Sequence, residues 1–192
     1  MNIELIKKEI AESISVKTTL MNDMSLLNKV IEVAGLCVES LMHGGKVIFC
    51  GNGGSFADAQ HLSAEFTSRF LFDRPPLCSI ALGTNNSGLT AMGNDYGYEN
   101  IFSRELEAIG KPEDILIGIT TSGNSENIVK AVGAAKALKI KTFILTGTSG
   151  GKLKGIADCI HVPSDETARI QECHILLGHI ICGFVEKEMF GK

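Results

Sequence analysis

Short apolar runs alternate with segments of helical spacing along most of the chain. The runs are KVIFC at 46–50, LCSIAL at 77–82, DILIGIT at 114–120, KTFILT at 141–146 and CIHVP at 159–163. Each run is continuous instead of alternating with polar residues, which is typical of parallel strands covered by helices on both faces. The pattern therefore predicts an α/β fold, a three-layer sandwich with a five-stranded parallel sheet flanked by helices.

The chain before the first apolar run shows helical spacing only. Four apolar residues recur at i, i+4, i+7 and i+11, as on the buried stripe of an amphipathic helix: Leu26, Val30, Val33 and Cys37. We expect two helices that break near the sequence MNDMS and stop at Gly44 and Gly45. A helical arm in this place usually packs on another surface, and a second copy of the chain could supply it.

Length, charge and cysteine usage narrow the class of protein. A chain of 192 residues suits one domain, with helices over 1–44 and the sandwich over 45–192. The net charge of −4 offers no basic surface for nucleic acid, and no stretch approaches the ~18 apolar residues of a membrane span. The six cysteines form no CxxC pair, as in cytoplasmic proteins with reduced thiols. We therefore expect a cytoplasmic protein whose partners include neither nucleic acid nor membrane.

Two strand-to-helix loops are rich in glycine and hydroxyl residues. GNGGS follows the first apolar run and TTSGNSEN follows the third, where ligands of parallel sheets and anions at helix N-termini bind. The second loop offers hydroxyls from Thr120, Thr121, Ser122 and Ser125, which can surround a phosphate. Ser125 could instead serve only as a helix cap, with Glu126 in the first turn. Because the chain has no GxGxxG or GxxxxGK[ST], the predicted ligand is a phosphorylated small molecule.

Two helices carry polar residues suited to acid–base or metal chemistry. His61 and Glu65 are four residues apart, so they share a helix face. They could chelate a divalent metal, pair an acid with a base, or simply decorate an exposed surface. In the last helix, about 100° per residue places His179 about 20° from Glu172 and about 80° from Gln171. Periodicity alone therefore pairs His179 with Glu172, although a satisfied core histidine is an alternative for His179.

Five segments together resemble the phosphoheptose isomerases of the sugar-isomerase (SIS) domain superfamily. They are GNGGSFADAQHLSAEFTSRF, GNDYGYENIFSRELEAIG, TTSGNSENIVKAV, LTGTSGGKL and ARIQECHILLGHIICGFVEKE, in the family's order over nearly the whole chain. The resemblance implies a SIS fold and a homotetramer with active sites at subunit interfaces. It also implies isomerisation of sedoheptulose 7-phosphate to D-glycero-D-manno-heptose 7-phosphate through an enediol, the first step toward bacterial ADP-heptoses and GDP-heptoses.

The resemblance also assigns the site residues. The catalytic acid–base pair falls on Glu65 and His179. The family's divalent metal, zinc where it is known, falls on His61, Glu65, Gln171 and His179. The resemblance thus selects Gln171, and not Glu172, as the partner of His179. The substrate-binding positions fall on Asn52, Gly53, Gly54, Ser55, Glu65, Arg69, Asn94, Asp95, Thr120, Thr121, Ser122, Ser125 and Gln171.

Two positions depart from the family's pattern. Thr120 stands where many members carry serine, and both residues supply a hydroxyl. Ala168 stands where some members carry an aspartate, a carboxylate that Asp165 or Glu166 could replace here.

A non-catalytic function is the alternative. Some SIS relatives bind a replication-initiator protein and isomerise no sugar, although they share the GNG and GNS loops and an ARIQE stretch. They typically lack the glutamate and the histidine that stand here as Glu65 and His179, so the sequence favours an enzyme. A phosphosugar-sensing regulator normally carries a DNA-binding domain, for which 192 residues leave no room.

Overall fold

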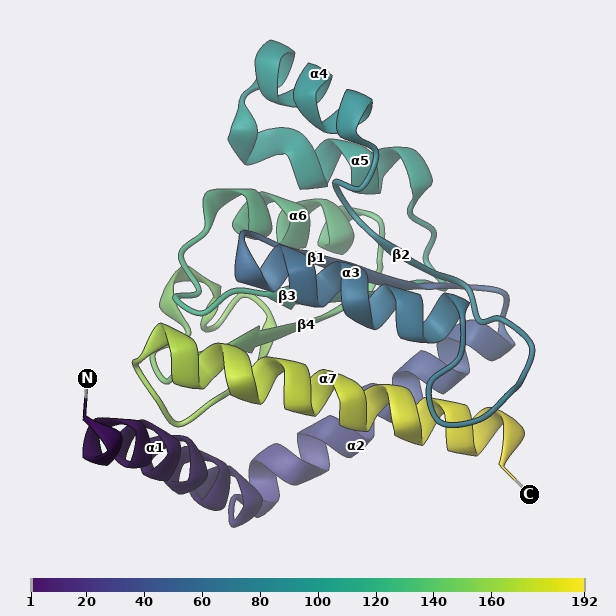
Figure 1. Cartoon of the computed structure of the whole chain (residues 1–192). Helices are drawn as coiled ribbons and strands as arrows, with labels where there is room; N and C mark the ends of the chain where they lie inside the picture. Colours follow the sequence, from purple (N-terminus) through teal and green to yellow (C-terminus); the bar gives the residue numbers. More distant parts are fainter. Residues whose placement is uncertain (1, 192) are drawn as a thin grey trace.

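The computed structural model describes residues 2–191 and contains the expected parallel sheet (Figure 1). The strands are β1 (Val47–Gly51), β2 (Ser79–Ala81), β3 (Ile115–Ile119), β4 (Lys141–Thr146) and β5 (Asp158–His161). They pair in parallel in the order β2-β1-β3-β4-β5. The order reverses between β1 and β3, and ligands of such sheets bind beyond the carboxyl ends of the strands at this point.

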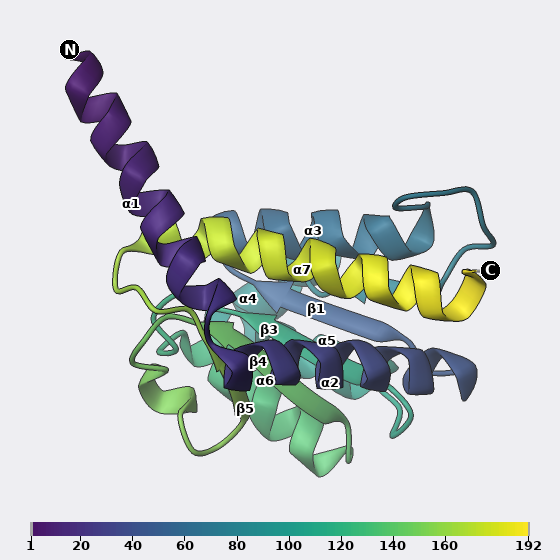
Figure 2. The ribbon, with the colours of Figure 1, turned by 90° about the horizontal axis from the view of Figure 1, so that it is seen from below.

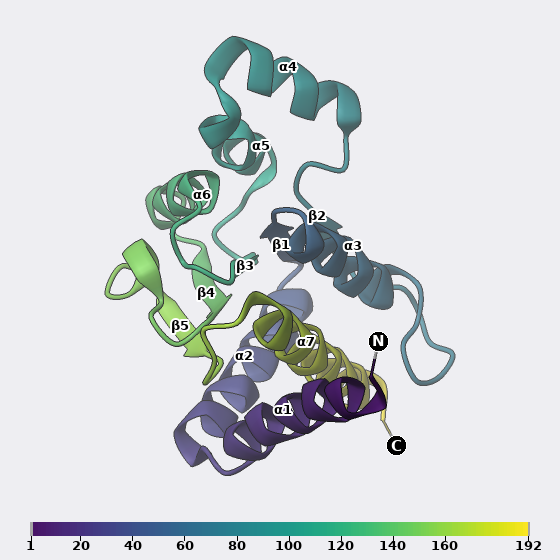
Figure 3. The ribbon, with the colours of Figure 1, turned by 60° about the vertical axis from the view of Figure 1, so that its left-hand side comes forward.

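Helices cover both faces of the sheet, as Figures 1 and 3 show. Successive strand residues point to opposite faces, so Val47 and Phe49 enter one core and Ile48 and Cys50 the other. The first core is closed by α2, α3 and α7, and the second by α5 and α6. The bounds are α2 (Met24–Met42), α3 (Gly54–Thr67), α5 (Ile101–Ile109), α6 (Glu126–Ala137) and α7 (Thr167–Phe190). The three-layer prediction is confirmed.

The first helix, α1 (Ile3–Met21), extends beyond the sandwich as an arm (Figure 2). The predicted break lies at Asn22, and the side chain of Asp23 caps α2. Only Leu20 of α1 is buried. One face of the arm instead exposes four isoleucines, each more than half accessible: Ile3, Ile6, Ile10 and Ile14. This row of side chains is an apolar surface without a cover in the single chain.

Strand bounds differ from the sequence prediction at two places. The run 77–82 contributes only three residues to β2, because β2 is an edge strand and the chain turns at Gly83 with φ +87°. The run 159–163 is paired only as far as His161, and the N–H of Val162 makes the last bond to β4, at 2.8 Å to the carbonyl of Thr146. Between β2 and α5, the chain forms α4 (Asn86–Tyr96) and the short helix η1 (Tyr98–Asn100), and η2 (Gly151–Leu153) precedes β5.

A buried ion pair fixes the beginnings of β1 and β3. Asp114 is 2% exposed and accepts hydrogen bonds from the backbone N–H of Lys46 at 2.9 Å and of Lys111 at 2.8 Å. The Nζ of Lys46 lies 2.7 Å from the same carboxylate. The carboxylate therefore satisfies three donors where two neighbouring strands begin.

Replacing Asp114 by alanine should lower the free energy of unfolding by about 3 kcal/mol, because two backbone N–H groups lose their partner and the partly buried Lys46 loses its counter-charge. Urea denaturation measures the change. The exposed Asp73 provides the control, and its alanine variant should stay within about 0.5 kcal/mol of wild type. Equal midpoints for the two variants would contradict the role of Asp114.

Buried His174 makes the fold sensitive to acid. Its side chain lies fully inside the core on α7. Burial lowers its pKa to about 4, partly opposed by a contact with the backbone of Thr146. The folded protein therefore keeps this imidazole neutral, whereas the unfolded chain binds a proton once the pH falls below about 6.5.

Between pH 7 and pH 5, this difference should lower the stability of the protein by about 2 kcal/mol. A His174→Leu variant cannot take up that proton. Between pH 7 and pH 5, its free energy of unfolding should therefore fall by about 2 kcal/mol less than that of wild type. Denaturant midpoints at the two pH values test this. Parallel pH profiles for the variant and wild type would show that His174 is not the group responsible.

Candidate active site

Three side chains of metal-ligand type converge where α3 lies beside α7. His61 Nε2 lies 2.9 Å from His179 Nε2 and 3.2 Å from Glu65 Oε1. The two imidazole rings meet edge to face, with centroids 5.1 Å apart. Ligand atoms of all three residues lie within 4.8 Å of one another. The helix-face pair and the histidine of the last helix thus form one cluster within a single chain, which we term the His–Glu–His cluster.

Gln171 and Glu172, although adjacent on α7, point to different helices. The amide of Gln171 lies against Gly54, where an added Cβ would come within 2.6 Å of its Nε2. Glu172 instead accepts a hydrogen bond from Ser13 on α1 at 2.5 Å. The pairing of His179 with Glu172 is therefore wrong. Seven residues along α7, about 10 Å, the neighbouring helix has changed from α3 to α1.

The His179 imidazole favours its neutral form. Burial lowers the pKa of His179, the adjacent His61 lowers it further, and Glu65 raises it. The ring of Phe70 stacks on His179 with centroids 5.4 Å apart. A neutral imidazole can bind a metal or accept a proton at neutral pH.

Asp58 is a residue of this region that the sequence analysis missed. Gly54, Asp58, His61 and Glu65 recur at i, i+4, i+7 and i+11, so they form one stripe along α3. Within residues 2–191, the buried Oδ2 of Asp58 has no hydrogen-bond partner. Burial raises its pKa, against the lowering effect of His61. The spacing of three residues before His61 was the signal available in the sequence.

The first loop approaches the cluster through glycine. Gly53 occupies the cap position before α3 with φ +56°, a left-handed conformation that favours glycine. Ser55, in the first turn of α3, is buried. The Asn52 side chain forms two reciprocal hydrogen bonds with buried Asn127, at 2.9 and 2.8 Å. Tyr98 also donates to Asn52, at 2.9 Å. The first loop is therefore tied to α6, the helix that the second loop begins.

The second loop presents its hydroxyls at the N-terminus of α6. Ser125 occupies the cap position, but its side chain makes no capping hydrogen bond and lies 3.2 Å from the hydroxyl of Thr120. Ser122 is exposed and Thr121 is half-buried. Gly147, after β4, donates from its N–H to the carbonyl of Thr121 at 3.0 Å. The hydroxyl of Ser125 therefore contacts Thr120 and does not cap α6.

Other predicted positions lie outside the His–Glu–His cluster in the described chain. Arg69 is exposed in the loop after α3. Asn94 and Asp95 are exposed on α4, where the amide of Asn94 donates to Asp95 at 2.8 Å. Glu166 lies beside two glutamates of the arm, with carboxylate oxygens within 4.8 Å of one another. Glu166 thus faces α1.

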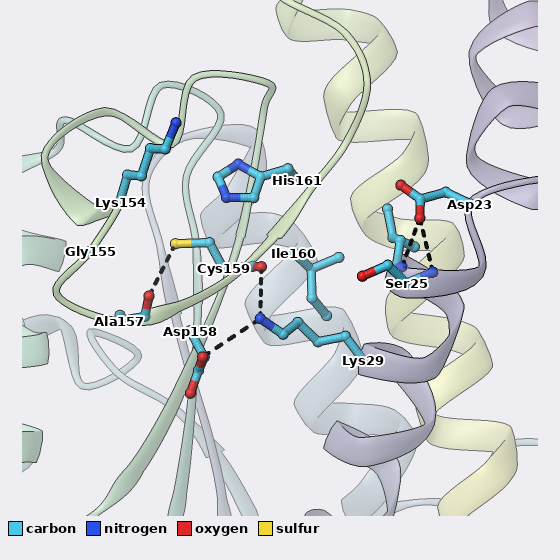
Figure 4. A pocket seen from close by; sticks show the side chains of 11 residues that line it. Asp23, Ser25, Lys29, Lys154, Gly155, Ala157, Asp158, Cys159, Ile160 and His161 are labelled. Atoms are coloured by element: carbon cyan, nitrogen blue, oxygen red, sulfur yellow. Dashed lines mark hydrogen bonds and ion pairs between the residues drawn. The ribbon is translucent and has the colours of Figure 1, made fainter.

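A separate cleft lies between α2 and β5 (Figure 4). It has a volume of about 340 Å³, and its charged side chains are Asp23, Lys29, Lys154 and Asp158. Lys29 already contacts Asp158 and the carbonyl of Cys159, each at 3.5 Å. His161 also lines the cleft and points Nδ1 to the carbonyl of Gly147 at 3.2 Å. These internal contacts join a helix to an edge strand, and the cleft contains none of the predicted site residues.

The comparisons with known proteins identify the family of the chain. The family model of the SIS domain matches residues 14–147, so the fold and its two loops are those of a SIS domain. A phosphoheptose isomerase of Sulfurimonas denitrificans is 53% identical over 187 residues, covering 97% of this chain and 96% of the relative. One of Aneurinibacillus thermoaerophilus is 53% identical over 188 residues, covering 97% and 95%.

Solved structures lead to the same family. A phosphoheptose isomerase from Francisella tularensis superposes with a TM-score of 0.91 at 39% identity, over 97% of this chain and 100% of the other. One from Neisseria gonorrhoeae gives 0.88 at 41% identity, over 96% and 98%. The chain belongs to the phosphoheptose isomerases, and it is therefore an enzyme that isomerises a sugar phosphate. The alternative of a non-catalytic SIS protein gains no support from these relatives.

The buried Asn127 should act on substrate binding through Asn52. An Asn127→Ala variant removes both reciprocal hydrogen bonds and leaves Tyr98 as the remaining hydrogen-bond partner of the Asn52 side chain. Asn52 is then less firmly oriented, and KM for the sugar phosphate should rise about tenfold. Steady-state kinetics measure this change. An Asn28→Ala variant on the exposed surface of α2 should keep the wild-type KM. An unchanged KM in Asn127→Ala would show that the pair is not needed for binding.

Proposed function

We propose that the chain converts sedoheptulose 7-phosphate to D-glycero-D-manno-heptose 7-phosphate, the first step toward ADP-heptoses and GDP-heptoses. The observation that carries this proposal is the meeting of His61, Glu65 and His179 between α3 and α7. A proton-transferring pair lies there, and hydroxyl groups cluster at the N-terminus of α6. The names of the relatives support a phosphorylated heptose as substrate.

The His–Glu–His cluster fits a divalent metal such as zinc. Ligand atoms around a tetrahedral zinc ion lie about 3.3 Å apart, close to the observed 2.9 and 3.2 Å. Histidine nitrogens and carboxylate oxygens are among the usual ligands of zinc. His61, Glu65 and His179 would hold the ion, and Gln171 completes the proposed set. When bound, the metal polarises the carbonyl and hydroxyl oxygens of the sugar.

The hydroxyl-rich loop anchors the phosphate in this proposal. Thr120, Thr121, Ser122 and Ser125 surround it with hydroxyls, and the first N–H groups of α6 point in the same direction. Binding the phosphate far from the reacting carbons positions C1 and C2 for proton transfer. The threonine at position 120 supplies the same hydroxyl as the serine of other family members.

Glu65 and His179 move the protons. Isomerisation transfers a proton between C1 and C2 through an enediol, which requires a base at carbon and an acid at oxygen. Glu65 is mostly buried, with 20% of its side chain exposed. It lies on the same stripe of α3 as Gly54, which belongs to the first loop. The lowered pKa of His179 leaves its imidazole able to accept a proton. The two groups therefore form the proposed acid–base pair.

We further propose a cytoplasmic homotetramer with active sites at subunit interfaces. The uncovered isoleucines of α1 require a partner surface, because a row of apolar side chains gains free energy when removed from water. Arg69, Asn94 and Asp95 are exposed, which suits residues that serve the site of a neighbouring copy. All six cysteines are free thiols, as is usual in a reducing compartment. No described helix is both long and apolar enough to span a membrane.

Turnover of sedoheptulose 7-phosphate, followed by NMR of the aldose product, tests the proposal. Glu65→Gln and His179→Gln should each lower kcat by about 10²–10⁴-fold, because each removes a proton-transferring group. His43→Gln is the matched control, since His43 lies at the end of α2 and contacts only a local carbonyl in the described chain, that of Glu39 at 2.7 Å.

Metal dependence belongs to the same experiment. Protein treated with a chelator should lose turnover, and added zinc should restore it. No turnover by wild type under any metal condition would exclude this substrate, and other phosphosugars would then be compared. Full activity in both variants would exclude the assigned acid–base pair.

A further inference from the structure

A buried carboxylate near the end of α7 organises the loop that leaves α3. Glu186 is 1% exposed and accepts hydrogen bonds from the backbone N–H groups of Phe70 at 2.8 Å and Leu71 at 2.6 Å. It also pairs with Arg74 at 3.0 Å, and the side chain of Arg74 is only 2% exposed. The loop between α3 and β2 is thereby held to α7 at three points.

Arg74 links Glu186 to the end of α3, the helix that carries Glu65. Its guanidinium donates to the carbonyl of Glu65 and to that of Phe66, both at 2.7 Å. It also donates to the carbonyl of Ser68, at 3.2 Å. The last carbonyls of a helix have no partner within the helix, so Arg74 closes the end of α3. The backbone of the proposed acid–base residue Glu65 is therefore fixed directly by a side chain that Glu186 holds.

Phe70 completes the arrangement from the other side. Its ring lies against Gly183, where an added Cβ would be 3.3 Å from Phe70 Cε1. Gly183 is one helical turn after His179 on the same face of α7, and the ring stacks on the His179 imidazole at an interplanar angle of 25°. The imidazole is thus enclosed between the face of Phe70 and the edge of His61.

We propose that Glu186, Arg74 and Phe70 are positioning residues for the acid–base pair. Glu186 holds the loop, Arg74 fixes the backbone of Glu65, and Phe70 fixes the ring plane of His179. The inference rests on the proposed function, in which Glu65 and His179 transfer the protons. None of the three residues contacts the hydroxyl-rich loop in the described structure. Their effect should therefore fall on kcat and on metal affinity, and not on phosphate binding.

Phe70→Leu is the decisive variant, because it removes the ring and leaves the buried ion pair intact. We expect kcat to fall about tenfold or more, with KM for the sugar phosphate within about twofold of wild type. Phe70→Tyr retains a planar ring and should keep kcat within about twofold. Phe72→Leu, in the same loop but exposed, is the matched control. Glu186→Gln should resemble Phe70→Leu, and if it does not fold, Phe70→Leu carries the test.

Two readouts do not depend on turnover. Chelator competition on metal-free protein should show zinc affinity about tenfold weaker in Phe70→Leu, within the range typical of residues that orient a ligand. The His179 signals to compare are the NMR cross-peaks between its ring and the ring of His61, whose centroids are 5.1 Å apart. These cross-peaks should weaken in Phe70→Leu and stay unchanged in Phe72→Leu. Unchanged urea midpoints in Phe70→Leu separate positioning from loss of fold.

The outcomes separate this proposal from the function it rests on. The positioning role would be overturned if Phe70→Leu kept the kcat, the zinc affinity and the His179 signals of wild type. If kcat of Phe70→Tyr fell as far as that of Phe70→Leu, the proposed role of ring stacking would be overturned. If wild type isomerises no sugar phosphate, the proposed function fails, while zinc affinity and the NMR signals still decide the positioning role. If wild type also binds no zinc, the His179 signals alone decide it.

Discussion

Close contact between α3 and α7 is the constraint on which the site depends. At Gly178 an added Cβ would lie 2.5 Å from the side chain of Leu62, so the helices meet where α7 has no side chain. His61 precedes Leu62 on α3 and His179 follows Gly178 on α7, and their Nε2 atoms are 2.9 Å apart. A wider spacing would separate the imidazoles beyond the reach of one metal ion. Helix packing thus sets the geometry of the chemistry.

The sheet places the other half of the site. Since β1 and β3 are adjacent but their helices cover opposite faces, the loops that follow them open side by side at the carboxyl edge. The reciprocal amide pair of Asn52 and Asn127 joins these loops across the edge. One loop leads into α3 and the other presents its hydroxyls at α6. The proposed acid–base residues and the proposed phosphate-binding loop are therefore held by different layers and joined by a short polar bridge.

Periodicity and loop composition predicted the parts of this structure that depend on local sequence. The buried runs specified the five strands, and the clusters of glycine and hydroxyl residues marked the ligand edge. The choice of Gln171 over Glu172 could not be derived in this way, because it depends on where α1 crosses α7. Contacts such as Arg74 with Glu186 join residues 112 positions apart. Local patterns contain no information about such distant partners.

In the proposed homotetramer, the arm formed by α1 would link assembly to the site through mass action. Its polar side is bound to α7 through Glu172, which accepts from Ser13 and pairs with Lys17 at 3.1 Å. Gln171 is the preceding residue on α7. If the apolar side of the arm is covered by another copy, dilution exposes it and weakens the whole arm. Subunit concentration would then govern how firmly the first turns of α7 are held, and the specific activity of the enzyme would depend on its own abundance in the cell.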